Sequence, residues 1–262
     1  SCGCLPELGH EVVGVDTNPL KVDMINAGRS PVVEERIDEL IAKGVAAGRL
    51  RATGDLRDAI ASTEVSLISV ATPAGPNNAP DLSAVDAVVR DIGRAIRDKA
   101  APHVVVLRST VPPGTTEHRI RGLLEEASGR AIGDGVSLVF NPEFLREGSS
   151  VRDFFNPPQT IVGSLDDAGF DAMAAMYHGL PGAFVRTTPP VAESVKYLCN
   201  VFHALKIVFA NEAGSVLKSF GLDGREVMKI FFPSPPPSPA DLKTRPASAS
   251  GGCRRGRGPG GP

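Results

Sequence analysis

The sequence predicts an α/β fold, in which a doubly wound parallel sheet is followed by the start of an α-helical central domain and by a disordered tail. Short apolar runs alternate with helical patterns through the first 188 residues. Residues 191–220 then contain no proline, whereas glycine and proline make up 14 of the last 30 residues. The predicted domains are therefore residues 1–188, a partial helical domain at 189–232 and a Pro/Gly/Arg-rich tail at 233–262.

Five apolar runs are predicted to be strands. Each is rich in Val, Ile or Leu, and the segments between most of them are long enough for a helical crossover, which indicates parallel strands with helices on both faces of the sheet. This pattern is typical of a Rossmann-like domain. The runs are residues 11–16, 65–70, 104–108, 136–140 and 160–163.

The helices are predicted from apolar spacing and from their ends. Asn18 and Pro19 are a typical cap and first residue for a helix over 20–27. Residues 81–97 place six apolar side chains at helical spacing behind Asp81 or Ser83 as cap. Residues 191–220 form one long helix that ends at Gly221, and residues 221–232 begin another.

Composition excludes several classes of protein. The 262 residues are 42% hydrophobic and 22% charged, as in ordinary globular proteins and unlike collagen, coiled coils or disordered chains. Residues 1–232 carry 23 basic and 29 acidic side chains, so no nucleic-acid partner is expected, and an RNA-contacting tail is the weaker alternative. No membrane partner is expected either, because no apolar run reaches the roughly 18 residues that a membrane span needs.

The cysteines indicate the compartment. Four cysteines in a chain of this length are typical of reduced thiols in a cytoplasmic protein. Cys2 and Cys4 have the wrong spacing for a zinc knuckle, so no metal site is predicted.

Asp16 is a candidate cofactor residue because it ends the predicted strand 11–16. In dinucleotide-binding units, an acidic residue at the end of the second strand accepts hydrogen bonds from the adenosine ribose and repels a 2′-phosphate. Asp16 therefore favours NAD over NADP, and a strand-end Asp that serves as a helix cap is the alternative. By this interpretation the first strand and its glycine turn would precede residue 1.

Polar side chains also follow three other predicted strands. Thr72 and Thr110 come directly after two of them, where ligands bind in open α/β sheets, although ordinary turn chemistry is the alternative. Glu143 and Glu147, after a third strand, are four residues apart and are expected on one face of a helical turn. Either could then act as a general acid or base, or both could be solvated.

The long helix carries a polar stripe. At about 100° per residue, Lys196, Asn200, His203 and Asn211 share a face roughly 80° wide on a helix that is otherwise rich in Val, Leu, Phe and Ala. The pattern favours a polar wall that faces a ligand, with a solvent-facing stripe as the alternative.

Together these motifs resemble the UDP-glucose/GDP-mannose dehydrogenase family. The similarity runs from about residue 3 to residue 231 in one order and spacing, and the motifs that carry it are residues 9–16, 70–73, 108–114, 141–147 and 196–203. Within the family, residues 196–214 and 223–228 are most similar to the enzymes that act on GDP-mannose. Enzymes that act on UDP-glucose are the alternative.

The resemblance implies oxidation of the C6 alcohol of a sugar nucleotide to a carboxylate with two NAD. It implies that Asp16 and Lys21 hold the adenosine ribose and that Thr72 and Thr110 line the NAD site. It also implies that Glu147 binds the substrate and helps to hydrolyse a thioester intermediate. Lys196 and Asn200 would bind the substrate and stabilise the C6 oxygen. His203 and Asn211 would complete the substrate site.

The family's nucleophile is a cysteine in a Gly-Gly-Ser-Cys-Leu-Pro-Lys-Asp loop, to which this sequence has no match after Phe232. Cys253 follows two glycines but lacks that context, and it is not predicted to be the nucleophile. A non-catalytic nucleotide-binding remnant is therefore the alternative to an enzyme. The resemblance also implies a homodimer that forms through the central helical domain.

Overall fold

A computed structural model of the chain describes residues 1–75 and 78–231. The predicted tail at 233–262, with Cys253, lies outside the described residues. The chain divides into two compact units, Ser1–Leu205 and Lys206–Pro262, and each is described by itself. The predicted domain boundary at residue 188 stays a prediction.

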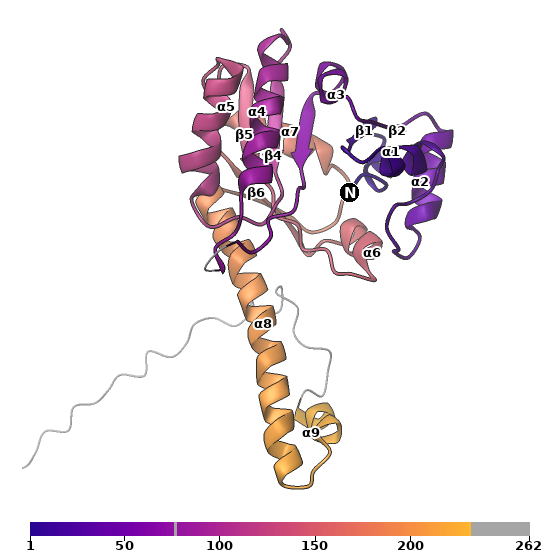
Figure 1. The fold of residues 1–262 in the computed structure, drawn as a ribbon, viewed down its shortest axis with the longest axis vertical. Helices are drawn as coiled ribbons and strands as arrows, with labels where there is room; N and C mark the ends of the chain where they lie inside the picture. Colours follow the sequence, from indigo (N-terminus) through magenta and orange to yellow (C-terminus); the bar gives the residue numbers. More distant parts are fainter. Residues whose placement is uncertain (76–77, 232–262) are drawn as a thin grey trace, which may run out of the picture. The chain divides into compact units, whose positions relative to one another are not determined.

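The first unit contains two sheets (Figure 1). Strands β1 (Val12–Val15) and β2 (Leu50–Thr53) pair in parallel. A five-stranded sheet has the order β3-β4-β5-β6-β7. Its strands are Val65–Ile68, His103–Leu107, Val136–Phe140, Gln159–Ser164 and Ala183–Thr187. The α/β, Rossmann-like prediction is confirmed, and the five predicted strands are β1, β3, β4, β5 and β6.

One part of the parallel-sheet prediction is wrong, because β6 pairs antiparallel with β5. The pairing covers only Val139 with Ser164 and Phe140 with Gly163, at the carboxyl end of β5. The connection between the two strands contains only the short helix α6 (Ser150–Phe155), so the chain re-enters the sheet beside the end of β5 that it left. Strand β7 then pairs parallel with β6, and Thr187 lies opposite Gly163.

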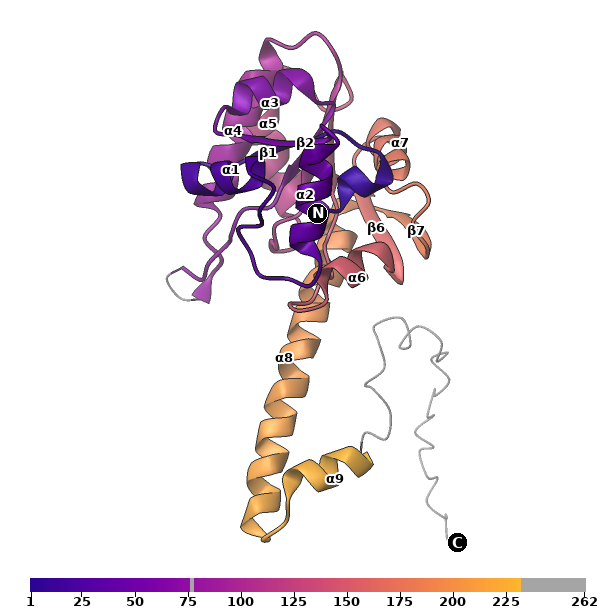
Figure 2. The ribbon, with the colours of Figure 1, turned by 90° about the vertical axis from the view of Figure 1, so that its right-hand side faces the viewer.

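Helices connect the strands along the chain, and Figure 2 shows several of them, among them α1, α3, α4 and α7. The predicted cap is confirmed for helix α1 (Pro19–Asn26). Asn18 accepts a hydrogen bond from the Leu20 amide at 3.0 Å, and Pro19 opens the helix. The helices of the first unit are η1 (Leu5–Leu8), α1 (Pro19–Asn26), α2 (Ile37–Ala46), α3 (Leu56–Ser62), α4 (Ser83–Arg97), η3 (Thr116–Ile120), α5 (Arg121–Ser128), α6 and α7 (Asp167–Met176).

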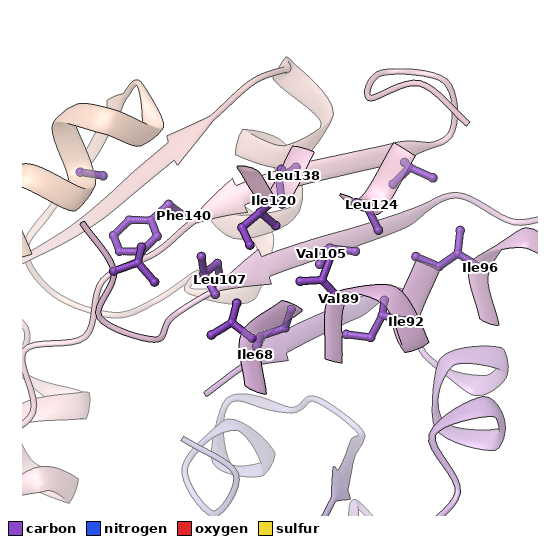
Figure 3. Close-up of a cluster of buried hydrophobic side chains, with 14 of the residues drawn as sticks. Ile68, Val89, Ile92, Ile96, Val105, Leu107, Ile120, Leu124, Leu138 and Phe140 are labelled. Carbon is purple, nitrogen blue, oxygen red and sulfur yellow. The ribbon is translucent and has the colours of Figure 1, made fainter. Parts of the chain in front are cut away.

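Both faces of β4 are buried, which explains why the four residues after His103 are all apolar. Alternate residues Val105 and Leu107 pack with α4 and α5 in one cluster (Figure 3). Val104 and Val106 point to the other face and join a second cluster, which includes Phe154 of α6. The sheet is therefore covered on both sides, and polar side chains can reach solvent or a ligand mainly at the ends of its strands.

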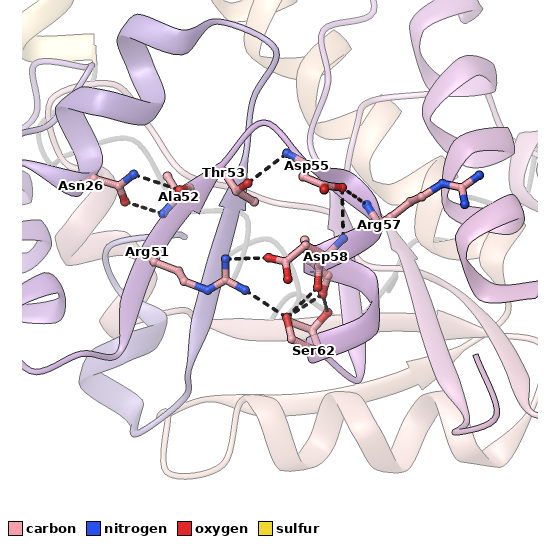
Figure 4. A network of polar contacts seen from close by, with 10 residues as sticks. Asn26, Arg51, Ala52, Thr53, Asp55, Arg57, Asp58 and Ser62 are labelled. Carbon is pink, nitrogen blue, oxygen red and sulfur yellow. Dashed lines mark hydrogen bonds and ion pairs between the residues drawn. The ribbon is translucent and has the colours of Figure 1, made fainter. Parts of the chain in front are cut away.

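Polar contacts fasten the β1–β2 sheet (Figure 4). The Asn26 side chain donates to the Ala52 carbonyl at 2.9 Å and accepts from the Ala52 amide at 2.7 Å, so it pairs with β2 as a neighbouring strand would. Arg51 forms an ion pair with Asp58 of α3 at 2.9 Å. Helix α1 thus covers the edge of β2 that faces away from β1.

Helices α4 and α5 approach closely at a glycine. A Cβ atom on Gly93 would lie 2.6 Å from the Ala127 Cβ and 3.2 Å from the Ser128 amide nitrogen. Gly122, on α5, has open space around the same position. The two glycines therefore differ in packing, although both lie inside helical stretches.

We expect Gly93→Ala to destabilise the fold by about 1–3 kcal/mol, because the added methyl group overpacks the contact with α5. Gly122→Ala is the control, and we expect it to stabilise the helix by about 0.5–1 kcal/mol through lower chain entropy. Urea unfolding of both variants measures the difference. Equal effects of the two substitutions would contradict the packing argument.

A buried histidine stands at the start of β4. His103 is 1% exposed, and its Nε2 lies 2.8 Å from the Ser66 hydroxyl. Lys99 donates to the carbonyls of Ile60 and Thr63 and to His103 Nδ1, the last at 3.0 Å. Nδ1 is therefore the acceptor and Nε2 carries the proton, so the imidazole is neutral and does not serve as a base for Ser66. Burial, with the Lys99 ammonium beside it, lowers the pKa of His103 to about 4.

Because the folded pKa of His103 lies below its ordinary value of about 6.5, the unfolded chain binds a proton more readily between these two pH values. We expect His103 to contribute its full stabilisation above pH 6.5. As the pH falls from 6.5 to 4, stability should drop by up to about 1.4 kcal/mol per pH unit. Urea unfolding across this range measures the slope. The substitution His103→Gln should flatten the slope of stability against pH, whereas the same substitution at the exposed His178 should not. An unchanged slope in His103→Gln would refute the assignment of this pH dependence to His103.

The second unit contains the latter part of α8 (Pro189–Ser219) and α9 (Gly224–Phe231). These confirm the two helices predicted over 191–220 and 221–232. Phe209 and Phe231 pack with their ring centroids 6.1 Å apart, and a Cβ on Gly224 would lie 3.4 Å from the Gly214 Cα. Small residues at this point let α9 approach α8 closely.

Candidate active site

The candidate site lies at the carboxyl ends of β3, β4 and β5, where three loops leave neighbouring parallel strands. Two of these loops are joined by side-chain hydrogen bonds. The Thr72 hydroxyl donates to the Thr110 carbonyl at 2.9 Å, and the Ser109 hydroxyl donates to the Val70 carbonyl at 2.6 Å. The structure therefore brings Thr72 and Thr110 together, and both are half-buried.

Lys196 reaches the third loop from α8. Its ammonium donates to the Glu143 carbonyl at 2.6 Å, lies 3.7 Å from Glu143 Oε1 and stands over the Phe144 ring at 5.5 Å from the centroid. Lys196 is only 7% exposed. A buried ammonium needs such partners, because leaving it unpaired away from water is costly. Lys196 is therefore a held cation at the carboxyl edge of the sheet.

The start of α8 is set by a glycine in β6. A Cβ atom on Gly163 would lie 2.7 Å from the Pro189 Cα and 2.7 Å from the Thr188 carbonyl oxygen. Only a residue without a side chain lets the chain pass this close. Since Thr187 lies level with the carboxyl end of β5, the first turns of α8 begin beside the loop that carries Glu143.

The expectation that Glu143 and Glu147 share a helical turn is wrong. Residues 141–146 have no regular secondary structure, and Glu147 follows in a turn with its side chain exposed. Of the two, Glu143 is the carboxylate beside Lys196. The signal that favours it is its position between the buried Pro142 and the half-buried Phe144, which hold this part of the loop against the protein.

The rest of this loop is anchored to α6 by an ion pair. Arg146 contacts Asp153 at 2.8 Å, and the Ser149 hydroxyl donates to the same carboxylate at 2.9 Å. The Arg146 guanidinium lowers the pKa of Asp153 to about 2, with a smaller contribution from Ser149. The loop is thus held at both ends, by Lys196 near Glu143 and by Asp153 near Arg146.

The other predicted residues of α8 are exposed. Asn200 and His203 lie on the surface of the first unit, and Asn211 is exposed in the second unit. Of the predicted stripe, the structure buries Lys196 and leaves these three side chains open to solvent. Their contact with a ligand stays a prediction.

Asp16 stands at the carboxyl end of β1 and is partly exposed. One carboxylate oxygen accepts from the Asn18 amide at 2.8 Å, and the other lies 3.1 Å from the Lys21 ammonium. The Asn18 hydrogen bond, aided by Lys21, holds the pKa of Asp16 below its usual range despite slight desolvation. The carboxylate is therefore ionised and accessible, as an adenosine ribose site requires.

A buried network that the sequence analysis missed braces the strand ends. Arg108 donates to Asn141 Oδ1 at 3.0 Å and to the Tyr177 hydroxyl. Tyr177 donates to the same amide oxygen at 2.8 Å, and Asn141 Nδ2 donates to the Ile161 carbonyl at 2.8 Å. Arg108 and Asn141 lie in the motifs at 108–114 and 141–147, but a strand-end cation and amide give no signal of such a network in the sequence.

Residues 1–180 match the NAD binding domain of the UDP-glucose/GDP-mannose dehydrogenase family, and residues 190–253 match that family's central domain. The chain belongs to the UDP-glucose/GDP-mannose dehydrogenase family. The family prediction and the choice of NAD as cofactor are thereby confirmed.

Three relatives illustrate the similarity. GDP-mannose 6-dehydrogenase of Azotobacter vinelandii is 45% identical over 250 residues, which cover 95% of this chain and 57% of the relative. UDP-glucose 6-dehydrogenase AglM of Haloferax volcanii is 37% identical over 86% of this chain and 53% of its own length. The crystal structure of a ternary complex of GDP-mannose dehydrogenase from Pseudomonas aeruginosa superimposes with a TM-score of 0.86 at 44% identity, over 89% of this chain and 53% of that one.

The chain thus spans a little more than half the length of these family members. Among its described residues, no group of three or more His, Cys, Asp or Glu side chains is arranged to hold a metal ion. None of the helices in the described part is both long and apolar enough to span a membrane.

Proposed function

We propose that this chain performs the NAD-dependent oxidation of GDP-mannose at C6 to GDP-mannuronate, in which two NAD molecules each accept one hydride and water supplies the second carboxylate oxygen. The observation that carries the proposal is the buried Lys196 beside Glu143, at the strand ends that also bear Thr72 and Thr110. GDP-mannose is favoured because GDP-mannose 6-dehydrogenases are 43–45% identical to the chain. UDP-glucose 6-dehydrogenases are 36–37% identical, and UDP-glucose is the second candidate substrate.

The residues of β1 and of the strand-end loops fit the cofactor. The ionised Asp16, with Lys21 beside it, would accept the adenosine ribose hydroxyls and would repel the 2′-phosphate of NADP. Thr72 and Thr110 would line the remainder of the cofactor site. When bound, NAD supplies a hydride acceptor for the C6 carbon.

The chemistry at C6 needs a positive charge and a base. The Lys196 ammonium would stabilise the negative charge that develops on the C6 oxygen, and Asn200, four residues later on α8, would donate a second hydrogen bond to it. Glu143 is near enough to Lys196 to take the alcohol proton or to orient a water molecule. Glu147, His203 and Asn211 would contact the sugar nucleotide.

NADH absorbance on the purified chain tests the proposal. We expect turnover with GDP-mannose and NAD. Turnover should be slower when UDP-glucose replaces GDP-mannose, and slower still when NADP replaces NAD. Glu143→Gln and Lys196→Met should each lower kcat by about 100-fold or more, because each removes a group used in the transition state. Glu147→Gln is the matched control in the same loop, and it should raise KM more than it lowers kcat.

Three results would contradict parts of this assignment. Faster turnover with UDP-glucose would favour the second candidate substrate. NAD binding without turnover on either sugar nucleotide would refute an enzymatic role and favour the non-catalytic remnant. A larger loss of kcat in Glu147→Gln than in Glu143→Gln would move the base to Glu147.

We also propose that the chain forms a homodimer through α8. Within the first unit, Leu198, Val201, Phe202 and Leu205 are between 41% and 66% exposed. Their spacing places them on one helical stripe. A contiguous apolar stripe of this kind marks a protein interface, and a self-complementary stripe produces a twofold dimer.

Sedimentation velocity tests the dimer. We expect the mass of two chains, and a shift to one chain when Leu198→Glu and Leu205→Glu are combined, since two charges would then have to be buried in the interface. Val33→Glu is the control, because Val33 is fully exposed outside α8 and should leave the dimer intact. A single-chain mass for the unaltered protein would overturn this proposal.

A further inference from the structure

A second charged side chain of α8 is buried one turn before Lys196. Glu193 is completely inaccessible to solvent, and its carboxylate faces the segment that follows β4. Oε1 accepts hydrogen bonds from the Thr116 amide at 2.8 Å and from the Thr116 hydroxyl at 2.6 Å. Oε2 accepts one from the Gly114 amide at 2.5 Å.

These contacts make Glu193 the cap of another helix. Thr116 begins the helical stretch formed by η3 and α5, and Thr115 in the cap position provides no side-chain hydrogen bond to it. Free amides at a helix start favour a negative charge, and Glu193 supplies it from α8. Gly114 has φ +88°, a conformation that favours glycine, and this turns its amide toward the carboxylate.

All three partners of Glu193 are donors, so the geometry suits the ionised carboxylate. Burial raises the pKa of Glu193, whereas the hydrogen bonds from Thr116 and Gly114 act in the opposite direction. A neutral acid could donate only to the Thr116 hydroxyl, because the amides of Thr116 and Gly114 cannot accept a hydrogen bond.

The position of Glu193 joins it to both halves of the candidate site. Gly114 is four residues after Thr110, whose carbonyl accepts from Thr72. Lys196, three residues after Glu193, holds the carbonyl of Glu143. Two consecutive turns of α8 therefore hold the loops that follow β4 and β5, one through a carboxylate and the other through an ammonium.

We propose that Glu193 is a positioning residue. It keeps the loop after β4, which carries Thr110, in a fixed position relative to Lys196 and to the loop after β5. The roles of Thr110 and Lys196 toward cofactor and substrate rest on the proposed function, whereas the coupling of the two loops through α8 does not. Glu193 itself touches neither cofactor nor substrate in this arrangement.

Hydrogen exchange measured by mass spectrometry on the full chain tests the coupling. Glu193→Gln keeps the shape of the side chain, but its amide nitrogen cannot accept a hydrogen bond. We expect exchange to accelerate at least fivefold in peptides from residues 109–118. We expect a smaller acceleration in peptides from 141–148, which make no bond to Glu193 and depend on it only through α8. Peptides from 167–176 should be unchanged.

Two variants complete the test. Glu117→Gln is the matched control, because it removes a negative charge next to Thr116 without altering α8, and it should leave both loops unchanged. Thr116→Val removes only the hydroxyl contact, so it should reproduce the pattern of Glu193→Gln at lower amplitude. This variant decides the question if Glu193→Gln does not fold.

The pattern of exchange separates the outcomes. Acceleration confined to 109–118 would make Glu193 a local helix cap and overturn the proposal, as would no change or a uniform acceleration across the protein. In a chain that turns over, Glu193→Gln should also lower kcat and raise the KM for NAD together. Absence of turnover in the unaltered chain would refute the proposed function, while the exchange pattern would still decide the role of Glu193.

Discussion

The arrangement of the site depends on the burial of both faces of the sheet around β4. Because helices cover each face, the side chains of β4 and β5 are apolar apart from His103 and Ser137 near their amino ends, and the polar groups of the candidate site lie at the carboxyl ends. Three parallel neighbours end at one edge, so their loops meet there. Side chains help to hold these loops in place, and Thr72, Asn141 and Lys196 each donate a hydrogen bond that does so.

The parts of the fold that follow from local sequence could be predicted. Strands β4 and β5 are short, mostly apolar runs, and α4 repeats apolar residues at helical spacing, so one segment of sequence predicts each element. Strand β2, with Arg51 exposed in four residues, and the half-buried β7 have no such run and were missed. The direction of β6 was also beyond prediction, because it depends on how the chain returns after Phe140 and on a pairing of only two residues.

The site likewise contains residues that local sequence could predict and residues that depend on contacts between distant parts of the chain. Lys196 could be singled out because a lysine in an apolar helix needs a reason to be there, and its burial agrees with that interpretation. From the residues alone the choice between Glu143 and Glu147 could not be made, and only the family resemblance favoured Glu147, since the loop is not helical and its path is set by contacts with α6 and α8. Glu193 gave no signal at all, because an acid in a helix is ordinarily solvated and its partners lie 77 residues or more away in the sequence.

The pairing of Asn26 with Ala52 has a consequence for the behaviour of the protein at high concentration. A free strand edge offers amides and carbonyls on which a strand of another molecule can assemble. On β2 the Asn26 amide occupies one such donor and acceptor as a peptide group would. A single side chain thus interrupts the template along this four-residue edge, and together with the exposed Arg51 we expect it to hinder the addition of a strand to β2.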